Sequence, residues 1–170
     1  MTFEQAKQKE AQAVAVFIRR KWAEELYYRY VNSSVRMSRL DGMLVEEHTE
    51  GHLEANGLLD SVFLVAGVEV KWRRFNLSTL MTQHNGAMLM PADKLLAGQT
   101  LAYAFGVPTL LLYLLNDCLL AQKVVAGNGD KVNVIKEIYE LSDRTIEGGT
   151  IQRKNCYIKT EGAEEIPLGL

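Results

Sequence analysis

The stretch Ser61-Val-Phe-Leu-Val-Ala-Gly-Val68, continued by Glu69-Val70-Lys71, decides how this chain folds. An apolar run of this length without a charge, rich in β-branched residues, predicts a buried strand that extends to Trp72. Because side chains alternate along a strand, Glu69 and Lys71 share one face, and their apolar neighbours share the other. Burying a charge without a partner is costly, so charged residues at the end of a core strand need a physical reason. A divalent metal with an attacking water would supply one.

The acid-x-lysine triplet formed by Glu69 and Lys71 is weak as an isolated signal. Such a triplet arises by chance about once in a chain of ordinary composition and this length. Here it is the only one in 170 residues, and it falls where the hydrophobic pattern ends. Its position therefore raises it above the background.

The composition is that of an ordinary globular protein. At 170 residues, with 48% hydrophobic and 24% charged residues, the length suits a single domain over residues 1–170 with a sizeable core. The net charge of −2 gives no overall attraction to nucleic acid or to an anionic membrane. Local basic patches must then provide any nucleic-acid binding, and the patch around Arg73 and Arg74, next to the triplet, is the better candidate than Arg19-Arg20-Lys21.

Cysteine usage and hydropathy indicate a cytoplasmic protein without a membrane span. Cys118 and Cys156 are too few and too far apart for a disulfide framework, so reduced thiols are expected. Residues 95–115 carry no formal charge, but Gly106-Val107-Pro108 interrupts them. We therefore predict a helix followed by a strand inside a core.

The N-terminal region, residues 4–30, predicts a long helix. At 100° per residue its apolar stripe comprises Ala11, Val14, Ala15, Ile18, Trp22 and Leu26. Glu25 lies near the middle of this stripe, and an acid on a packing face is unusual. It is a candidate site residue, with a helix-end position near the rim as the alternative.

Further elements follow the helix in an α/β order. An extended segment over residues 35–47 carries Asp41, and the 61–72 strand comes next. A helix from Pro91 to about residue 105 leads into an apolar strand over 109–115, which suggests a β-α-β crossover. Residues 132–141 and 150–158 predict two further strands, so the chain ends in a β-rich tail.

Asp41 and Glu69 could form a magnesium site if their strands are adjacent. Magnesium prefers oxygen ligands and binds through one or two carboxylates together with waters and substrate phosphate. Lys71 could orient or deprotonate the water, or neutralise charge on the phosphate, and a plain salt bridge to Glu69 is the alternative. Asp60 is closer in sequence, but it begins the strand that ends in Glu69, which separates the two by about 30 Å.

The order of these motifs resembles the PD-(D/E)XK nuclease superfamily, the restriction-endonuclease-like fold, over residues 20–120. The resemblance rests on Leu40-Asp41-Gly42-Met43-Leu44, on Val68-Glu69-Val70-Lys71, and on Lys94-Leu95 through Gly106-Val107-Pro108. It implies a mixed central sheet flanked by helices, here with a β-rich C-terminal extension, and Mg²⁺-dependent hydrolysis of phosphodiester bonds in DNA, with Mn²⁺ as a substitute. Asp41 and Glu69 would be metal ligands, Lys71 the catalytic lysine, and Glu25 the acid that some branches place on the first helix.

The predicted 91–105 helix offers two accessory residues. Gln99 and Tyr103 resemble the Gln-x-x-x-Tyr motif of the exonuclease branch, whereas Lys94 shares its face with the small residues Ala97 and Gly98. Lys94 and Gln99 are about 140° apart around the helix, so both cannot point into one site. We rank Lys94 above Gln99.

Two alternatives stay open. The histidines His48, His52 and His84 could indicate other metal chemistry, but they lack the partner ligands that such a site needs and are expected in loops. A catalytically inactive nuclease-fold subunit of a nucleic-acid-processing assembly is the other, because fold does not fix function. The modest net charge suits a nuclease that forms a homodimer or works beside a DNA-binding partner.

Overall fold

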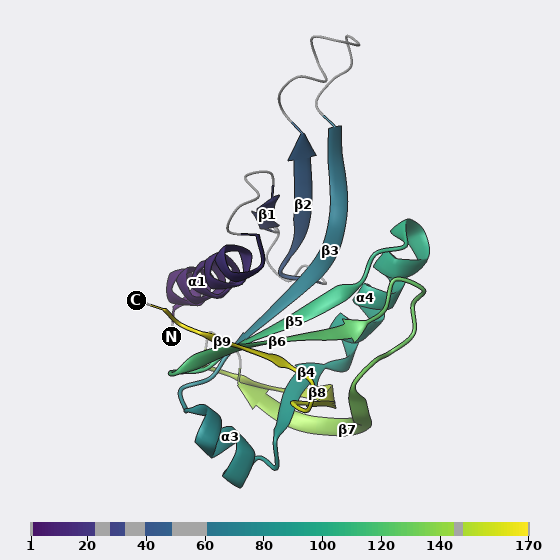
Figure 1. The fold of residues 1–170 in the computed structure, drawn as a ribbon. Helices are drawn as coiled ribbons and strands as arrows, with labels where there is room; N and C mark the ends of the chain where they lie inside the picture. Colours follow the sequence, from purple (N-terminus) through teal and green to yellow (C-terminus); the bar gives the residue numbers. More distant parts are fainter. Residues whose placement is uncertain (1, 23–27, 33–39, 49–60, 145–147, 170) are drawn as a thin grey trace, which may run out of the picture.

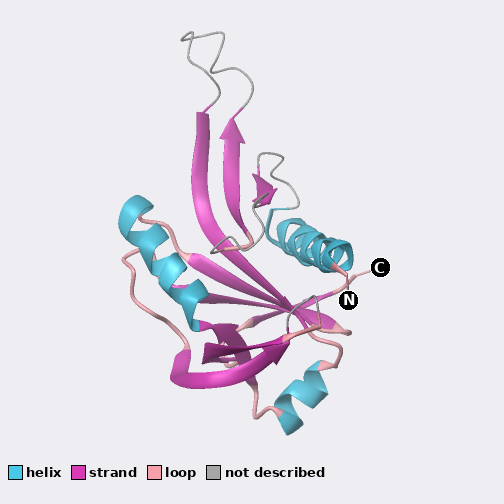
Figure 2. Ribbon diagram, turned by 180° about the vertical axis from the view of Figure 1, so that it is seen from behind, coloured by secondary structure: helices cyan, strands magenta, loops and turns pink. Residues whose placement is uncertain are grey.

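The computed structural model describes residues 2–22, 28–32, 40–48, 61–144 and 148–169. Within them the elements run in the order α1 (Phe3–Trp22), β1 (Tyr28–Asn32), β2 (Gly42–His48), β3 (Ser61–Trp72), α3 (Leu77–Gln83), β4 (Ala87–Pro91), α4 (Ala92–Phe105), β5 (Thr109–Leu114), β6 (Cys118–Val125), β7 (Val134–Arg144), β8 (Thr150–Lys159) and β9 (Glu164–Pro167). The protein is thus a mixed α/β structure (Figures 1 and 2).

The larger sheet is mixed and has the strand order β1-β2-β3-β5-β6-β9. β1, β2 and β3 pair antiparallel, β3 and β5 pair parallel, and β6 and β9 continue antiparallel. The parallel pair confirms the predicted crossover, because α4 lies between β3 and β5 in the sequence. β3 is therefore an interior strand, hydrogen-bonded on both sides.

Helix α1 covers one face of this sheet, but its packing stripe differs from the predicted one. Ala13, Val14 and Phe17 are buried against the apolar face of β3, whereas Ala11 and Ala15 are exposed. The predicted helix also extends too far, because residues 28–30 belong to β1. The aromatic residues Tyr28 and Tyr30, followed by the β-branched Val31, favour a strand that pairs with β2.

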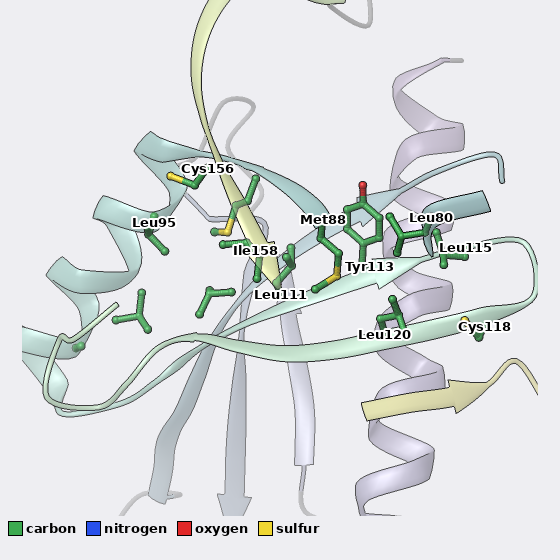
Figure 3. Packing of buried hydrophobic residues seen from close by; sticks show 14 residues of the cluster. Leu80, Met88, Leu95, Leu111, Tyr113, Leu115, Cys118, Leu120, Cys156 and Ile158 are labelled. Atoms are coloured by element: carbon green, nitrogen blue, oxygen red, sulfur yellow. The ribbon is translucent and has the colours of Figure 1, made fainter. Parts of the chain in front are cut away.

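The other face of the sheet packs against α4 and the smaller sheet, β4-β8-β7. Figure 3 shows this second apolar cluster, in which Leu95 of α4, Leu111 and Tyr113 of β5, and Ile158 of β8 meet. Gly98 lets α4 approach closely, because a Cβ there would lie 2.7 Å from Thr109 Oγ1 on β5. The sheet is thus flanked by a helix on each face, as the sequence predicts.

The apolar segment over 95–115 divides as expected into α4 and β5. Gly106 ends α4 in the left-handed conformation, with φ of 69°, which glycine adopts without strain. In the part of the chain that the structure describes, no helix is both long and apolar enough to span a bilayer.

Candidate metal-binding site at the end of β3

Glu69 is the most deeply buried charged residue of the candidate site. Its side chain is 0% exposed, and two lysines from different elements contact it. Lys71 Nζ lies 2.7 Å from Oε1, and Lys94 Nζ lies 3.4 Å from Oε2. Lys71 is close enough to donate a hydrogen bond, and among the described residues the two ammonium groups are the polar partners of the carboxylate. The buried carboxylate therefore relies on two lysines and leaves part of its capacity to accept hydrogen bonds unused.

Asp41 lies beside β3, in a bend directly before β2, and not within a strand as predicted. Its Oδ2 accepts a hydrogen bond of 2.8 Å from the backbone N–H of Val70. β2 pairs with β3 only as far as Gly42 opposite Val68, so the Asp41 carboxylate takes the place of the missing ladder partner. This contact holds the Asp41 carboxylate at Val70, the residue that follows Glu69 on β3.

The buried charges shift each other's protonation. Burial raises the pKa of Glu69, the neighbouring charge of Asp41 raises it further, and the attraction of Lys71 and Lys94 offsets only part of this. Burial alone would lower the pKa of Lys71, but the Glu69 and Asp41 carboxylates outweigh it and raise that pKa. Lys71 is therefore an ammonium ion at neutral pH, better suited to orient a water or stabilise negative charge than to accept a proton.

Of the two accessory residues on α4, the structure brings only Lys94 to Glu69. Gln99 instead donates a hydrogen bond of 2.9 Å to the backbone oxygen of Gly129. The buried Ala97 and Gly98 let the first turns of α4 lie close to the sheet, and this proximity allows the lysine to reach the carboxylate. The predicted ranking of Lys94 above Gln99 agrees with this placement.

The two arginines after β3 separate to opposite faces. The guanidinium of Arg73 lies 5.5 Å from the ring centre of Tyr113, on the site face, and that of Arg74 lies 5.0 Å from the ring centre of Trp72, on the α1 face. Arg73 is close enough to Lys71 for its charge to act on the lysine. Only Arg73 therefore extends the positive charge of the site.

Glu25 lies outside the described residues, whereas Glu10, which sequence reasoning missed, is a buried acid of α1. Glu10 is 7% exposed and faces the sheet from α1, where it accepts a hydrogen bond of 2.5 Å from the hydroxyl of Tyr30. It stands three, four and seven residues before Ala13, Val14 and Phe17, on the same helix face. That spacing could have identified it, had the stripe been placed one residue earlier.

Among the described residues, the histidines and cysteines form no competing metal centre. His84 stacks on Phe75 at the end of α3, with ring centres 4.8 Å apart, β2 ends at His48, and His52 lies outside the described residues. Burial and the nearby Asp117 raise the pKa of the Cys118 thiol to about 12, which makes it a poor nucleophile. Within the described ranges, no three His, Cys, Asp or Glu side chains gather to hold a metal ion.

Comparisons with known proteins give this site no relative. No protein-family model matches the chain, and neither the curated proteins nor the solved structures contain a match.

Proposed function

We propose that this protein is a Mg²⁺-dependent nuclease of the restriction-endonuclease-like class that hydrolyses phosphodiester bonds in DNA. The observation that carries the proposal is the Glu69 carboxylate, which is fully buried, lies next to Asp41 and is in contact with two lysines. A buried acid of this kind contributes little to stability, because a hydrophobic residue of similar size would serve the fold equally well. It is suited to binding a cation and an anionic substrate together.

The donor set fits a magnesium ion. Asp41 and Glu69 would hold the cation, Glu69 through oxygens that contact Lys71 and Lys94 and Asp41 through the oxygen not bonded to Val70. Two carboxylates without a histidine or thiolate suit a hard cation that keeps several waters, and Mn²⁺ would substitute for it. When bound there, the cation would polarise a phosphate oxygen and lower the pKa of a coordinated water.

The lysines would bind and orient the reacting groups. Lys71, protonated and 20% exposed, would donate to the attacking water or to the phosphate oxygens as negative charge develops. Lys94, 13% exposed, would exchange its contact with Glu69 for a phosphate oxygen. Arg73 would add a further contact to the DNA backbone on the same face.

The order of elements supports the same class. The chain runs from α1 through the strands that carry Asp41, Glu69 and Lys71 to α4 with Lys94, and then to β5, parallel to β3. This is the order on which the resemblance to PD-(D/E)XK nucleases rests. The smaller sheet, formed largely by the C-terminal strands, corresponds to the β-rich extension.

An Asp41→Asn variant tests the proposal directly. Asparagine keeps an oxygen that can accept from Val70, so the backbone contact survives while one carboxylate is lost. We expect wild type to cleave a DNA duplex with Mg²⁺ or Mn²⁺ and to gain about 2.7 kcal/mol of stability when the metal is at 100 times its Kd. The variant should lose both effects, and its metal-free stability should stay level or rise, because one of two neighbouring negative charges is removed.

The opposite pattern would contradict the nuclease assignment. If wild type shows no metal effect in thermal melts and Asp41→Asn destabilises the metal-free protein, the Asp41 and Glu69 charges serve the fold alone. The protein would then be a binding or structural subunit without catalysis.

A further inference from the structure

Glu10 and Tyr30 form a hydrogen-bonded pair behind the candidate site, on the α1 face of the sheet. The Tyr30 hydroxyl donates to Glu10 Oε1 at 2.5 Å, and Lys7 Nζ holds Oε2 at 2.8 Å. Burial raises the pKa of Tyr30, and the hydrogen bond and charge of Glu10 raise it further, so the phenol stays protonated and remains a donor. The direction of the Tyr30 side chain is thereby fixed.

The ring of Tyr30 occupies the space in which Gly42 would carry a side chain. A Cβ on Gly42 would collide with the outer ring carbons and the hydroxyl of Tyr30. Gly42 has no positive φ, so the close approach of this ring is what requires glycine here. The backbone at the start of β2 is therefore covered by the ring from the α1 face.

Asp41 directly precedes Gly42, and its carboxylate is held on the other side by the N–H of Val70. The bend at residues 40 and 41, which carries Asp41, thus leads into a backbone that the Tyr30 ring covers, while the Asp41 carboxylate is bonded to β3. Pairing of β1 with β2 ends at the same place, with Asn32 opposite Gly42.

We infer that Tyr30, held by Glu10, is a positioning residue that fixes the Asp41 carboxylate beside Glu69. Neither residue touches the reacting atoms, since both lie on the opposite face of the sheet. The inference deepens the proposed function: its metal-binding consequence rests on that function, whereas the placement of Asp41 does not. Partners that orient a metal ligand in this way commonly contribute tenfold or more to metal affinity.

Amide hydrogen exchange in the metal-free protein tests the placement of Asp41. Tyr30→Phe removes the hydroxyl and keeps the ring, so Gly42 stays covered but the ring loses its anchor. We expect exchange of the Val70 amide, whose proton bonds to Asp41, to become roughly fivefold faster, while the Leu112 amide at the centre of the sheet keeps its rate. Glu10→Gln, which keeps an acceptor for the hydroxyl, should give a smaller change in the same direction.

Tyr103→Phe is the matched control, because its hydroxyl is on an exposed ring far from Asp41 in the sequence, and it should change neither amide. Equal acceleration at Val70 and Leu112 in Tyr30→Phe would show general destabilisation and overturn the inference. So would unchanged exchange at Val70 in both Tyr30→Phe and Glu10→Gln.

Calorimetric titration with Mn²⁺ tests whether the placement of Asp41 by Tyr30 affects metal binding. We expect Tyr30→Phe to bind Mn²⁺ about tenfold more weakly than wild type and Tyr103→Phe to bind it normally. Wild-type affinity in Tyr30→Phe would overturn the role of Tyr30 in the metal site. Absence of Mn²⁺ binding by wild type would contradict the proposed function instead, and the exchange rate of Val70 would still decide whether Tyr30 positions Asp41.

Discussion

The two faces of β3 are equally buried but chemically opposite. Val68 points toward α1 and is 0% exposed among apolar neighbours, whereas Glu69, the next residue, points toward α4 and is also 0% exposed but charged. Burial of the apolar face stabilises the folded state. Burial of the charged face costs desolvation energy, which the ion pairs offset only in part. Burial therefore marks the core on one face and a candidate site on the other.

The helices that cover the two faces also differ in the residues that they place against the sheet. α1 fills its face with Ala13, Val14 and Phe17, which pack against the sheet. α4 presents the small residues Ala97 and Gly98, so the helix lies close enough for Lys94 to reach Glu69. The small residues on this face of α4 thus allow the charged Lys94 to reach the buried carboxylate of Glu69.

Replacing Lys71 with Ala should give the largest effect, because it removes a positive charge from the charged face of β3. If the proposed function holds, DNA cleavage should fall about 10² to 10³-fold, because the variant loses the ammonium that would stabilise charge in the transition state. Lys123→Ala, at an exposed position of β6, is the matched control and should cleave normally. Rates of plasmid cleavage with Mg²⁺ measure both, and an undiminished rate in Lys71→Ala would reduce this lysine to a salt bridge with Glu69.

The pH dependence of the free energy of unfolding measures the cost of burying Glu69 on the charged face of β3. The pKa of Glu69 in the folded state is raised above the ordinary 4.5. Its protonation therefore contributes fully to the free energy of unfolding below pH 4.5, and this contribution is lost as the pH rises through the raised pKa. The Glu69→Gln variant has no such titration. Relative to wild type it should therefore gain stability with rising pH, by at most about 1.4 kcal/mol per pH unit, and then level off.

Urea unfolding of both proteins from pH 4 upward measures this difference. In wild type, Lys71 adds no titration to this range, because its pKa is raised above 10.5 and its contribution declines only beyond that pH. Parallel stability curves would mean that the lysines fully compensate the burial of Glu69. A difference that shrinks with rising pH would mean that they lower its pKa.

Sequence patterns predicted the parts of the fold that rest on local periodicity. The 61–72 strand, the helix up to Phe105, the 109–114 strand and the faces of Glu69 and Lys71 follow from alternation, breakers and apolar runs. Helix geometry also predicted that Lys94 and Gln99 point to different places, and their side chains contact Glu69 and Gly129, respectively.

Features that depend on tertiary contacts were not predictable in this way. The sequence pattern extends the first helix into β1, because the pairing of β1 with β2 is a long-range interaction that no local pattern shows. Strand β4 was missed for the same reason, since it is defined by pairing with β8. The Glu10–Tyr30 pair joins residues 20 positions apart and depends on how α1 is rotated on the sheet, which an amphipathic stripe gives only approximately.

The smallest expected effect separates Arg73 from Arg74, adjacent residues that the sequence assigned together to DNA binding and that the structure sends to opposite faces. If DNA lies on the charged face, Arg73→Ala should weaken binding roughly fivefold and lower its salt dependence, and Arg74→Ala should change it less. Both variants belong in the Asp41→Asn background, so that the duplex stays intact, with affinity read from fluorescence anisotropy at several salt concentrations. Equal losses would mean that the duplex reaches around the end of β3 to the α1 face. No loss in either variant would assign both guanidinium groups to their aromatic partners, Tyr113 and Trp72, and would leave the charged face of β3 without a DNA contact from this segment.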